Sequence, residues 1–515
     1  MSAEAATPPV VAAEDRRRWL ALAVIVTAQF MVVLDISIVN VALPSIKTDL
    51  DFSQENLQWV ITAYSIFFGG FLLLGGRLAD LFGRRRLFMA GLSLFTVSSL
   101  LDGLAWSEGS LIAFRGLQGL GAAMMSPAAL SILTTTFAEG RERNRALGIW
   151  GAVAGSGGAV GVLLGGILTS AFSWPWIFYV NVPVGVAVLL LSPVLLRESR
   201  ADLSSRSFDF AGAVAITSGL MLLVYGMTRA TQHGWGTAET IGLLTASAVL
   251  IASFFLIESR TKAPLLPLRI LRLRTLAGSN LSALIATAAV FSQFFLLTLY
   301  MQQVLHYSAL KTGVAYVGLT VTTIALSAVA QGLVTKFGVR RILPVGLALS
   351  TVALVLFAQL PVDGHYFWDL FPGFVISGLG LAFVFIPMSI GALTGVRPAD
   401  AGIASGLINT SQQIGGAVGV AAATTIATTF TRHYVDSHAG VSPLSGAALT
   451  HGFEVAFYAL AATAAVGAVV AAVLIQPQPA QAEREPEGGE QVPAASQHTP
   501  VCQARRAHAA QPQPS

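Results

Sequence analysis

Apolar residues along this chain gather into fourteen stretches, each long enough to form one transmembrane helix. A bilayer core about 30 Å thick needs roughly 20 apolar residues per spanning helix, and backbone in lipid must be helical or form a closed barrel. The pattern therefore predicts an all-α integral membrane protein with fourteen transmembrane helices. The expected spans are 19–43, 57–76, 86–105, 110–136, 146–171, 176–196, 209–228, 238–257, 275–304, 312–333, 341–360, 368–393, 403–430 and 451–475.

Lysine and arginine residues in the loops test these spans independently, because their density alternates from one loop to the next. Loops on the side that holds the N-terminus carry 22 of them, whereas loops on the opposite side carry 4. Such an excess is typical of the cytoplasmic side of a membrane protein. We therefore expect a multi-pass protein of the plasma membrane with both termini in the cytoplasm.

Composition narrows the class of protein further. Charged residues make up 11% of the chain, under half the share in soluble domains, and mean hydropathy is +0.70. The net charge of +4 comes from loop arginines, so we expect no nucleic-acid partner. The single cysteine, Cys502, excludes an intrachain disulfide and a cysteine-based metal site. No nucleotide-binding loop, zinc-ligand spacing or nucleophile triad stands out, so we expect no enzyme activity, cofactor or metal.

Polar segments divide the chain into five parts. Both ends are rich in Ala, Pro, Gln and Glu, a composition typical of disorder. Two basic loops, at 197–208 and 258–274, bracket a pair of helices that hold almost no buried polar residues. The expected parts are a disordered cytoplasmic tail at 1–15, a six-helix bundle at 16–200, two inserted helices at 201–262, a second six-helix bundle at 263–475 and a disordered cytoplasmic tail at 476–515.

The two six-helix parts look like weak repeats of each other, related by a shift of about 255–259 residues. Both keep their glycines, while the ionisable groups survive only in the first. We therefore expect two bundles around a central cavity, with the proton or ion chemistry in the N-terminal bundle. The aligned pairs are Gly83 and Gly338, Asp80 and Thr335, Gly119 and Gly378, and Arg115 and Phe374.

Several short motifs resemble those of the major facilitator superfamily, and of its fourteen-helix drug:proton antiporter branch in particular. They cover the helix 1 motif, the loop between helices 2 and 3, the helix 4 motif, the start of helix 6 and the corner between helices 9 and 10. In chain order they are 34–44 (LDISIVNVALP), 76–86 (GRLADLFGRRR), 115–121 (RGLQGLG), 176–185 (WIFYVNVPVG) and 302–308 (QQVLHYS).

This resemblance implies a proton-coupled secondary exporter of hydrophobic or cationic small molecules, such as drugs or antibiotics, that works by alternating access. Its partners would be the substrate, protons and the lipid bilayer. In the helix 5 motif, Val162 follows Gly161 where the family has proline, so only the glycine spacing remains to bend the helix. Two alternatives stay open: a nutrient or metabolite uptake carrier of the same fold, and a membrane sensor that does not transport.

Asp35 and Arg115 are the candidate proton-coupling residues. Asp35 lies about 16 residues into its span, where carboxylates usually face a cavity and mark ion or proton pathways. A proton and a cationic substrate would compete for it; the alternative is a carboxyl tied into local packing. Arg115 starts about five residues into its span. It either tunes a nearby carboxyl or the proton route, or it snorkels to the membrane interface.

Gly76, Asp80, Gly83 and Arg84 belong to the loop motif on the cytoplasmic face. Asp80 can accept backbone donors at a helix N-terminus or pair with an arginine, and Gly83 permits a tight turn. We expect a conformational latch that holds one access state; simple topology signalling by the arginines is the alternative. Glycines also give helix 5 a smooth face, suited to sliding or to static packing. These glycines are Gly157, Gly161, Gly165 and Gly166.

A substrate pocket should be mostly apolar with a few polar groups. Polar residues on the spans that border the expected cavity are therefore candidates, and an interhelical hydrogen bond is the alternative role of each. The candidates are Gln29, Asn40, Tyr64, Gln118, Gln293, Tyr300, Asn409, Gln412 and Gln413.

Overall fold

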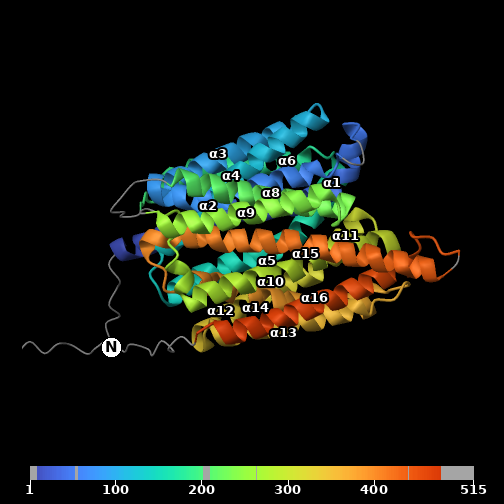
Figure 1. The fold of residues 1–515 in the computed structure, drawn as a ribbon. Helices are drawn as coiled ribbons and strands as arrows, with labels where there is room; N and C mark the ends of the chain where they lie inside the picture. The colour runs from blue at the N-terminus through green and yellow to red at the C-terminus, as the bar shows by residue number, and fades with distance from the viewer. Residues whose placement is uncertain (1–8, 53–55, 201–208, 262–263, 439, 477–515) are drawn as a thin grey trace, which may run out of the picture. The chain divides into compact units, whose positions relative to one another are not determined.

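The computed structural model of the chain describes residues 9–52, 56–200, 209–261, 264–438 and 440–476. All regular secondary structure within these ranges is helical. Figure 1 shows the long helices side by side along a common direction. Each of the fourteen expected spans falls on one helix or on two successive helices, which confirms the all-α membrane fold class.

Seven helices form the first six spans, because the sixth span is broken into two. They are α1 Pro9–Asp49, α2 Trp59–Phe82, α3 Arg84–Gly103, α4 Glu108–Thr136, α5 Arg141–Ala171, α6 Trp176–Tyr179 and α7 Asn181–Leu195. The expected inserted pair corresponds to α8 Phe210–His233 and α9 Ala238–Arg260.

The last six spans are interrupted by short turns of tighter or wider helix. In order, the elements are η1 Ile270–Arg272, α10 Arg274–Leu299, η2 Tyr300–Val304, α11 Ala309–Ala315, α12 Val317–Phe337, α13 Val339–Ala358, η3 Tyr366–Leu370, α14 Phe371–Leu393, η4 Pro398–Asp400, α15 Ala401–Ser437 and α16 Gly446–Leu474.

Length and composition alone identify 12 or 13 membrane crossings among the described residues, one or two fewer than the fourteen expected spans. Among the described residues, 12 helices are long and apolar enough to cross a membrane. A thirteenth is α5, whose segments Arg141–Gly158 and Val160–Ala171 meet at a bend of 44°. The fourteenth is α3, whose 20 residues begin with three arginines and include Asp102, which makes it more polar than the others.

The start of α1 differs from the expected disordered tail. The helix begins at Pro9, so residues 9–15 are helical. Proline suits the first turn of a helix, because its missing N–H would have no partner there. An ion pair between Asp15 and Arg18 adds local support. The rest of the two expected tails, 1–8 and 477–515, lies outside the described residues.

The two halves of the chain meet along a few helices. In the first half, α4 packs on α2 and α3, and α1 packs on α5. In the second half, α10 packs on α15 and α16, and α13 packs on α14 and α16. Contacts between α2 and α15, and of α5 with α12 and α14, join the two halves.

The helix pair α8 and α9 has a peripheral position. The two helices pack on each other, and α8 also packs on α2 and α15. Only 17% of the most apolar window of α9 is buried, compared with 83% for α4. Outward-facing side chains such as Val249 and Leu256 are therefore suited to contact with lipid. The division of the chain at 16–200, 201–262 and 263–475 stays a prediction.

Glycines aligned between the two halves make equivalent helix contacts. A side chain at Gly119 of α4 would collide with the backbone oxygen of Tyr64 on α2. A side chain at Gly378 of α14 would collide with the backbone oxygen of Leu319 on α12. The weak sequence repeat thus corresponds to a repeated close approach of two helix backbones.

We expect Gly119→Ala to destabilise the protein, because its methyl group would meet backbone that cannot rotate away. Overpacking of this kind costs about 1–3 kcal/mol. The control is Gly109→Ala on the same helix, where nothing lies within 4 Å of the added carbon. Thermal unfolding of the purified proteins in detergent measures the difference. Equal unfolding midpoints for the two variants would contradict the close contact between α2 and α4.

Candidate functional site

Asp35 of α1 and Arg115 of α4 form an ion pair inside the first half of the chain. Arg115 Nη1 lies 2.6 Å from Asp35 Oδ2, and the exposed fractions of the two side chains are 1% for Arg115 and 0% for Asp35. Burying an ion costs several kcal/mol, so a buried pair persists only when further hydrogen bonds satisfy both partners. Arg115 therefore points into the helix bundle and does not reach the membrane interface.

Hydrogen bonds from three side chains converge on the carboxylate of Asp35. Besides Arg115, Gln118 donates from Nε2 to Asp35 Oδ1 at 2.9 Å. Asn181, the first residue of α7, donates to the same oxygen at 3.3 Å and also to Ser99 Oγ at 3.1 Å. The carboxylate thus joins helices α1, α4 and α7, with α3 attached through Ser99.

The guanidinium group of Arg115 is equally well surrounded. Its Nε donates to the backbone oxygen of Val60 at 3.0 Å, and Nη1 also donates to Gln118 Oε1. The ring of Tyr64 lies 4.4 Å from the guanidinium carbon, and the ring of Phe178 lies 5.6 Å from it. These distances permit cation–π attraction in a site shielded from water.

Sequence reasoning did not select Asn181 or Ser99. Asn181 lies in the motif at 176–185, so the resemblance drew attention to the segment but not to this side chain. The break between α6 and α7 falls directly before it. Ser99 has no sequence signal, because a serine in an apolar helix usually bonds to its own backbone.

Asp80 and Arg84 form a second buried ion pair, at the junction of α2 and α3, with Arg84 Nη2 2.8 Å from Asp80 Oδ1. Backbone N–H groups of Gly402 and Ile403 donate to the two carboxylate oxygens, each at 3.3 Å. These N–H groups lie in the first turn of α15, the positive end of its dipole. Arg84 also donates to the backbone oxygen of Pro398 at 2.5 Å. Asp80 therefore both accepts backbone N–H groups at a helix N-terminus and pairs with an arginine, the two arrangements that the sequence suggested.

Two glycines make this contact possible. A side chain at Gly76 would collide with the backbone oxygen of Gly402, so α2 and α15 touch backbone to backbone. Gly83 has φ +113°, a conformation that other residues rarely adopt. A side chain at Gly83 would also lie 2.7 Å from the carboxylate of Glu198, which accepts a hydrogen bond from the backbone of Arg85 at 3.2 Å.

A further carboxylate, which sequence reasoning missed, supports the start of α15. Asp400 is 4% exposed and precedes the first residue of the helix. Arg269, from the segment before α10, lies 3.1 Å from Asp400, and Arg397 lies 2.9 Å from it. The segment that follows the inserted helices is thereby tied to the contact between the two halves.

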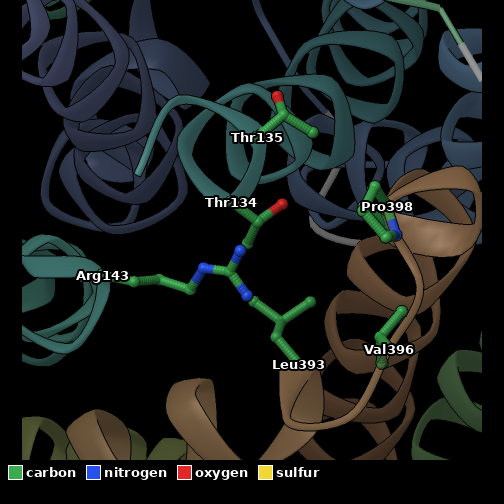
Figure 2. A pocket seen from close by; sticks show the side chains of 7 residues that line it. Thr134, Thr135, Arg143, Leu393, Val396 and Pro398 are labelled. Carbon is green, nitrogen blue, oxygen red and sulfur yellow. The ribbon is translucent and has the colours of Figure 1, made fainter. Parts of the chain in front are cut away.

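A small cavity lies beside this contact, between the ends of α4 and α5 and the segment from α14 to α15 (Figure 2). Its volume is about 20 Å³, room for about one water molecule. Figure 2 shows Arg143 pointing from α5 toward Thr134 and Leu393. The two halves are therefore closely packed on the arginine-rich side. The lining residues are Thr134, Thr135, Arg143, Leu393, Val396, Pro398 and Ala401.

The glycine face of α5 packs on α1. Carbon atoms added at Gly157, Gly161 or Gly165 would each lie closer than 3.0 Å to atoms of α1. Gly166 is buried on the same helix. The contact covers the part of α1 that carries Asp35, so the glycines bring α5 close to the buried carboxylate.

Four of the candidate pocket residues lie near the contact between the two halves of the chain. Ser126 of α4 donates to Gln29 Oε1 at 2.8 Å, and its hydroxyl lies 3.5 Å from Asn409 Oδ1 on α15. Gln412 and Gln413 are half-buried about one turn further along α15. These residues lie where polar groups of the two halves come together.

Other candidate pocket residues have contacts elsewhere. Gln293 donates to Ser377 at 2.7 Å, and Tyr300 donates to the backbone oxygen of Pro361 at 2.5 Å. Both contacts lie within the second half. The contact of Gln293 joins two helices and matches the interhelical alternative, whereas Tyr300 bonds to the loop between α13 and η3. Asn40 is exposed and donates to its own helix at 3.0 Å. Gln118 and Tyr64 belong to the surroundings of Arg115 described above.

Comparison with known proteins agrees with this architecture. The family model described as the Major Facilitator Superfamily matches residues 25–420. Among solved structures, a human organic anion transporter superposes with a TM-score of 0.63 at 14% identity, covering 90% of this chain and 100% of that chain. A proton:xylose symporter superposes with a TM-score of 0.61 at 13% identity, covering 90% of this chain and 97% of that chain. The fold is that of a polytopic membrane transporter.

Curated relatives are similar over nearly their whole length. The puromycin resistance protein of Streptomyces alboniger is 40% identical, covering 90% of this chain and 92% of its own. The cephamycin export protein of Amycolatopsis lactamdurans is 41% identical, covering 82% of this chain and 89% of its own. The chain belongs to the major facilitator superfamily.

We expect Gly83→Ala to destabilise the protein more than Gly338→Ala does. Both glycines have positive φ, so each substitution carries a backbone strain of about 1–3 kcal/mol. Only at Gly83 would the methyl group also meet Glu198, because nothing lies within 4 Å at Gly338. Thermal unfolding of the purified variants gives the comparison. A larger loss for Gly338→Ala would contradict this assignment of the Glu198 contact.

Proposed function

We propose that this protein exports a hydrophobic or cationic small molecule of the antibiotic class across the plasma membrane in exchange for protons. The buried pair of Asp35 and Arg115 is the observation that carries the proposal. A carboxylate at this depth costs several kcal/mol to bury, and such residues usually mark a pathway for ions or protons. The relatives named for antibiotic resistance and export support the substrate class.

Proton binding at Asp35 would change the electrostatic balance of the site. With Asp35 ionised, its charge compensates that of Arg115, and the neutral pair does not repel a cationic substrate. With Asp35 protonated, the guanidinium loses its counter-charge, and a cation bound nearby is repelled. Substrate and proton therefore compete for one group, which is what an exchanger requires.

The contact of Asp80 and Arg84 with α15 would act as the conformational latch. It joins the two halves on the arginine-rich side, which the charge count assigns to the cytoplasm. Closing this side leaves access from the opposite side, and opening it requires the hydrogen bonds to Asp80 to break. With both termini cytoplasmic, the latch controls entry of the substrate from inside the cell.

The substrate would bind where the two halves meet. Gln29, Asn409, Gln412 and Gln413 would supply the few polar groups that a substrate pocket needs there. The helices at 201–262 would stand outside the pocket. This role follows from their contacts, which involve α2 and α15 on one side and mostly exposed surface on the other.

Expression in a bacterial host that lacks its own drug pumps tests the proposal. A panel of antibiotics that includes puromycin and lincomycin should reveal compounds whose toxicity the protein reduces. Collapse of the proton gradient should then make cells accumulate those compounds. An uptake carrier would instead raise toxicity or nutrient entry, and a sensor would leave both unchanged.

We expect Asp35→Asn to abolish this resistance while the protein still inserts. Asparagine has the size of aspartate and one acceptor oxygen, which can keep the hydrogen bonds that Asp35 Oδ1 accepts from Gln118 and Asn181, but it has no charge and cannot bind or release a proton. Asp49→Asn on the same helix is the control, because Asp49 accepts a hydrogen bond from Trp174 at 2.7 Å that asparagine can keep. Growth in the presence of the drug, at equal expression, is the measurement. Full resistance with Asp35→Asn would rule out the proton role.

We expect Asp80→Asn to slow turnover by about tenfold or more while drug affinity changes little. Loss of the charge weakens hydrogen bonds worth about 1.5–3 kcal/mol each, and these bonds hold the closed state rather than the substrate. Arg86→Gln is the control, because Arg86 is 67% exposed and its pair with Glu198 contributes little. Transport and drug binding are measured on the purified proteins. A variant that lost affinity but kept its transport rate would contradict the latch.

A further inference from the structure

Asp102, in the last turn of α3, is a buried carboxyl that the mechanism above does not use. Its exposed fraction is 0%. Neither of its oxygens accepts a hydrogen bond from any residue that the structure describes. Buried polar groups nearly always have partners, and a carboxylate without any donor is the costliest exception. The sequence did not select Asp102, because a charge near the end of a span usually faces the interface.

Asp102 belongs to the same electrostatic unit as the buried ion pair. It lies within range of the charges of Arg115 and Asp35. Ser99, three residues earlier on the same face of α3, accepts a hydrogen bond from Asn181, which also donates to Asp35. The face of α3 that carries Asp102 is therefore turned toward the site.

The other titratable groups around Asp102 are few. Among the helices packed on α3, α4 contributes Arg115, α2 contributes Tyr64 over the guanidinium, and α6 contributes Tyr179. Tyr179 donates its hydroxyl to the backbone oxygen of Gly103 at 2.6 Å and so is already engaged. α7 contains no titratable side chain. Arg115 is thus the only cation among the described residues of this unit.

One guanidinium cannot balance two carboxylates. Asp35 receives donors from three side chains, whereas Asp102 receives none from the described residues. Asp35 thus has its hydrogen bonds in place, and Asp102 has none from the described residues. Because the guanidinium carries one positive charge, one proton on either carboxyl leaves the site electrically neutral, and a buried carboxyl without donors is costly to keep charged.

We propose that Asp102 is a second proton-binding group of this transporter, which passes its proton to Asp35. The inference rests on the proposed proton exchange. In the transfer, the O–H bond on Asp102 breaks and an O–H bond forms on Asp35, while Arg115 stays charged and changes its anionic partner. The total charge of the site does not change. Asp102 is then reprotonated from the side opposite the latch.

The position of Asp102 suits this role. It precedes the last residue of α3, at the end of the bundle opposite Asp80. Asp35 lies 14 residues before the end of α1, about 21 Å along the helix from that end. A proton that arrives from outside the cell would thus meet Asp102 before it reaches Asp35.

Infrared spectroscopy of the purified protein in lipid nanodiscs, without any drug, tests the protonation state. Protein labelled with carboxyl-¹³C aspartate should show at neutral pH an isotope-shifted band of a protonated carboxylic acid. The band should vanish in Asp102→Asn. It should also shrink in Asp35→Asn, because Asp102 would then be the only counter-charge of Arg115 and would ionise. In Asp102→Glu it should remain but lose the isotope shift, because glutamate is unlabelled. Absence of the band from the wild-type protein, or its persistence in Asp102→Asn, would overturn the proposal.

Transport in proteoliposomes tests the relay, with ethidium as the probe cation and a fixed proton gradient. We expect Asp102→Asn to lose at least about tenfold in gradient-driven transport and to show a flattened pH profile, and Asp102→Glu to restore both. A purely structural role would lower transport equally at every pH and would overturn the relay. A wild-type protein that moves no ethidium would instead count against the exported substrate class, and the infrared result would still decide the protonation of Asp102.

Discussion

The buried ion pair of Asp35 and Arg115 is the interaction on which the rest of the site depends. A charge in the hydrocarbon region is tolerated only with a counter-charge and full hydrogen bonding, so the pair dictates what surrounds it. Gln118 and Asn181 donate further hydrogen bonds to the carboxylate, and the backbone oxygen of Val60 accepts one from the guanidinium. These contacts join α1, α2, α4 and α7 at the ion pair. A change in the charge of Asp35 therefore alters the contacts of all four helices.

The helix α2 connects this point to the contact between the two halves. It supplies Val60 and Tyr64 to the surroundings of Arg115 at one end and Asp80 to the start of α15 at the other. The 20 residues between Val60 and Asp80 span about 30 Å of continuous helix. Because Gly119 lets α4 approach the backbone of α2, the helix that carries Arg115 packs directly on the helix that carries Asp80. This close packing would link the proposed proton site to the proposed latch.

Much of the fold could be predicted from the sequence, because span length and loop charge are local properties. The fourteen spans are of this kind, and so is the depth of Asp35. The environment of Arg115 was left open because it depends on where Tyr64 and the start of α2 lie in space. Asp102 escaped notice since its burial comes from neighbouring helices, whereas sequence position alone suggests an interfacial charge. The bend in α5 occurs beside Gly158 although Val162 replaces the family proline, so local glycines are enough to break the helix there.

The two six-helix parts differ in the charges that they carry at aligned positions. The partner of Arg115 in the repeat is Phe374, whose ring packs 5.2 Å from Tyr316 and 5.6 Å from Phe357 in a purely aromatic cluster. Thr335 stands in place of Asp80. Its hydroxyl bonds to Gln331 on its own helix at 3.0 Å and accepts a longer hydrogen bond from Asn144 at 3.4 Å. The second half therefore has no charge of its own at either position, but it supplies the N-terminus of α15 as a fixed positive dipole. In the proposed mechanism the buried carboxyls of the first half bind the proton. The stability of the contact between the halves would then depend on their protonation, which would couple proton binding to the relative movement of the two halves.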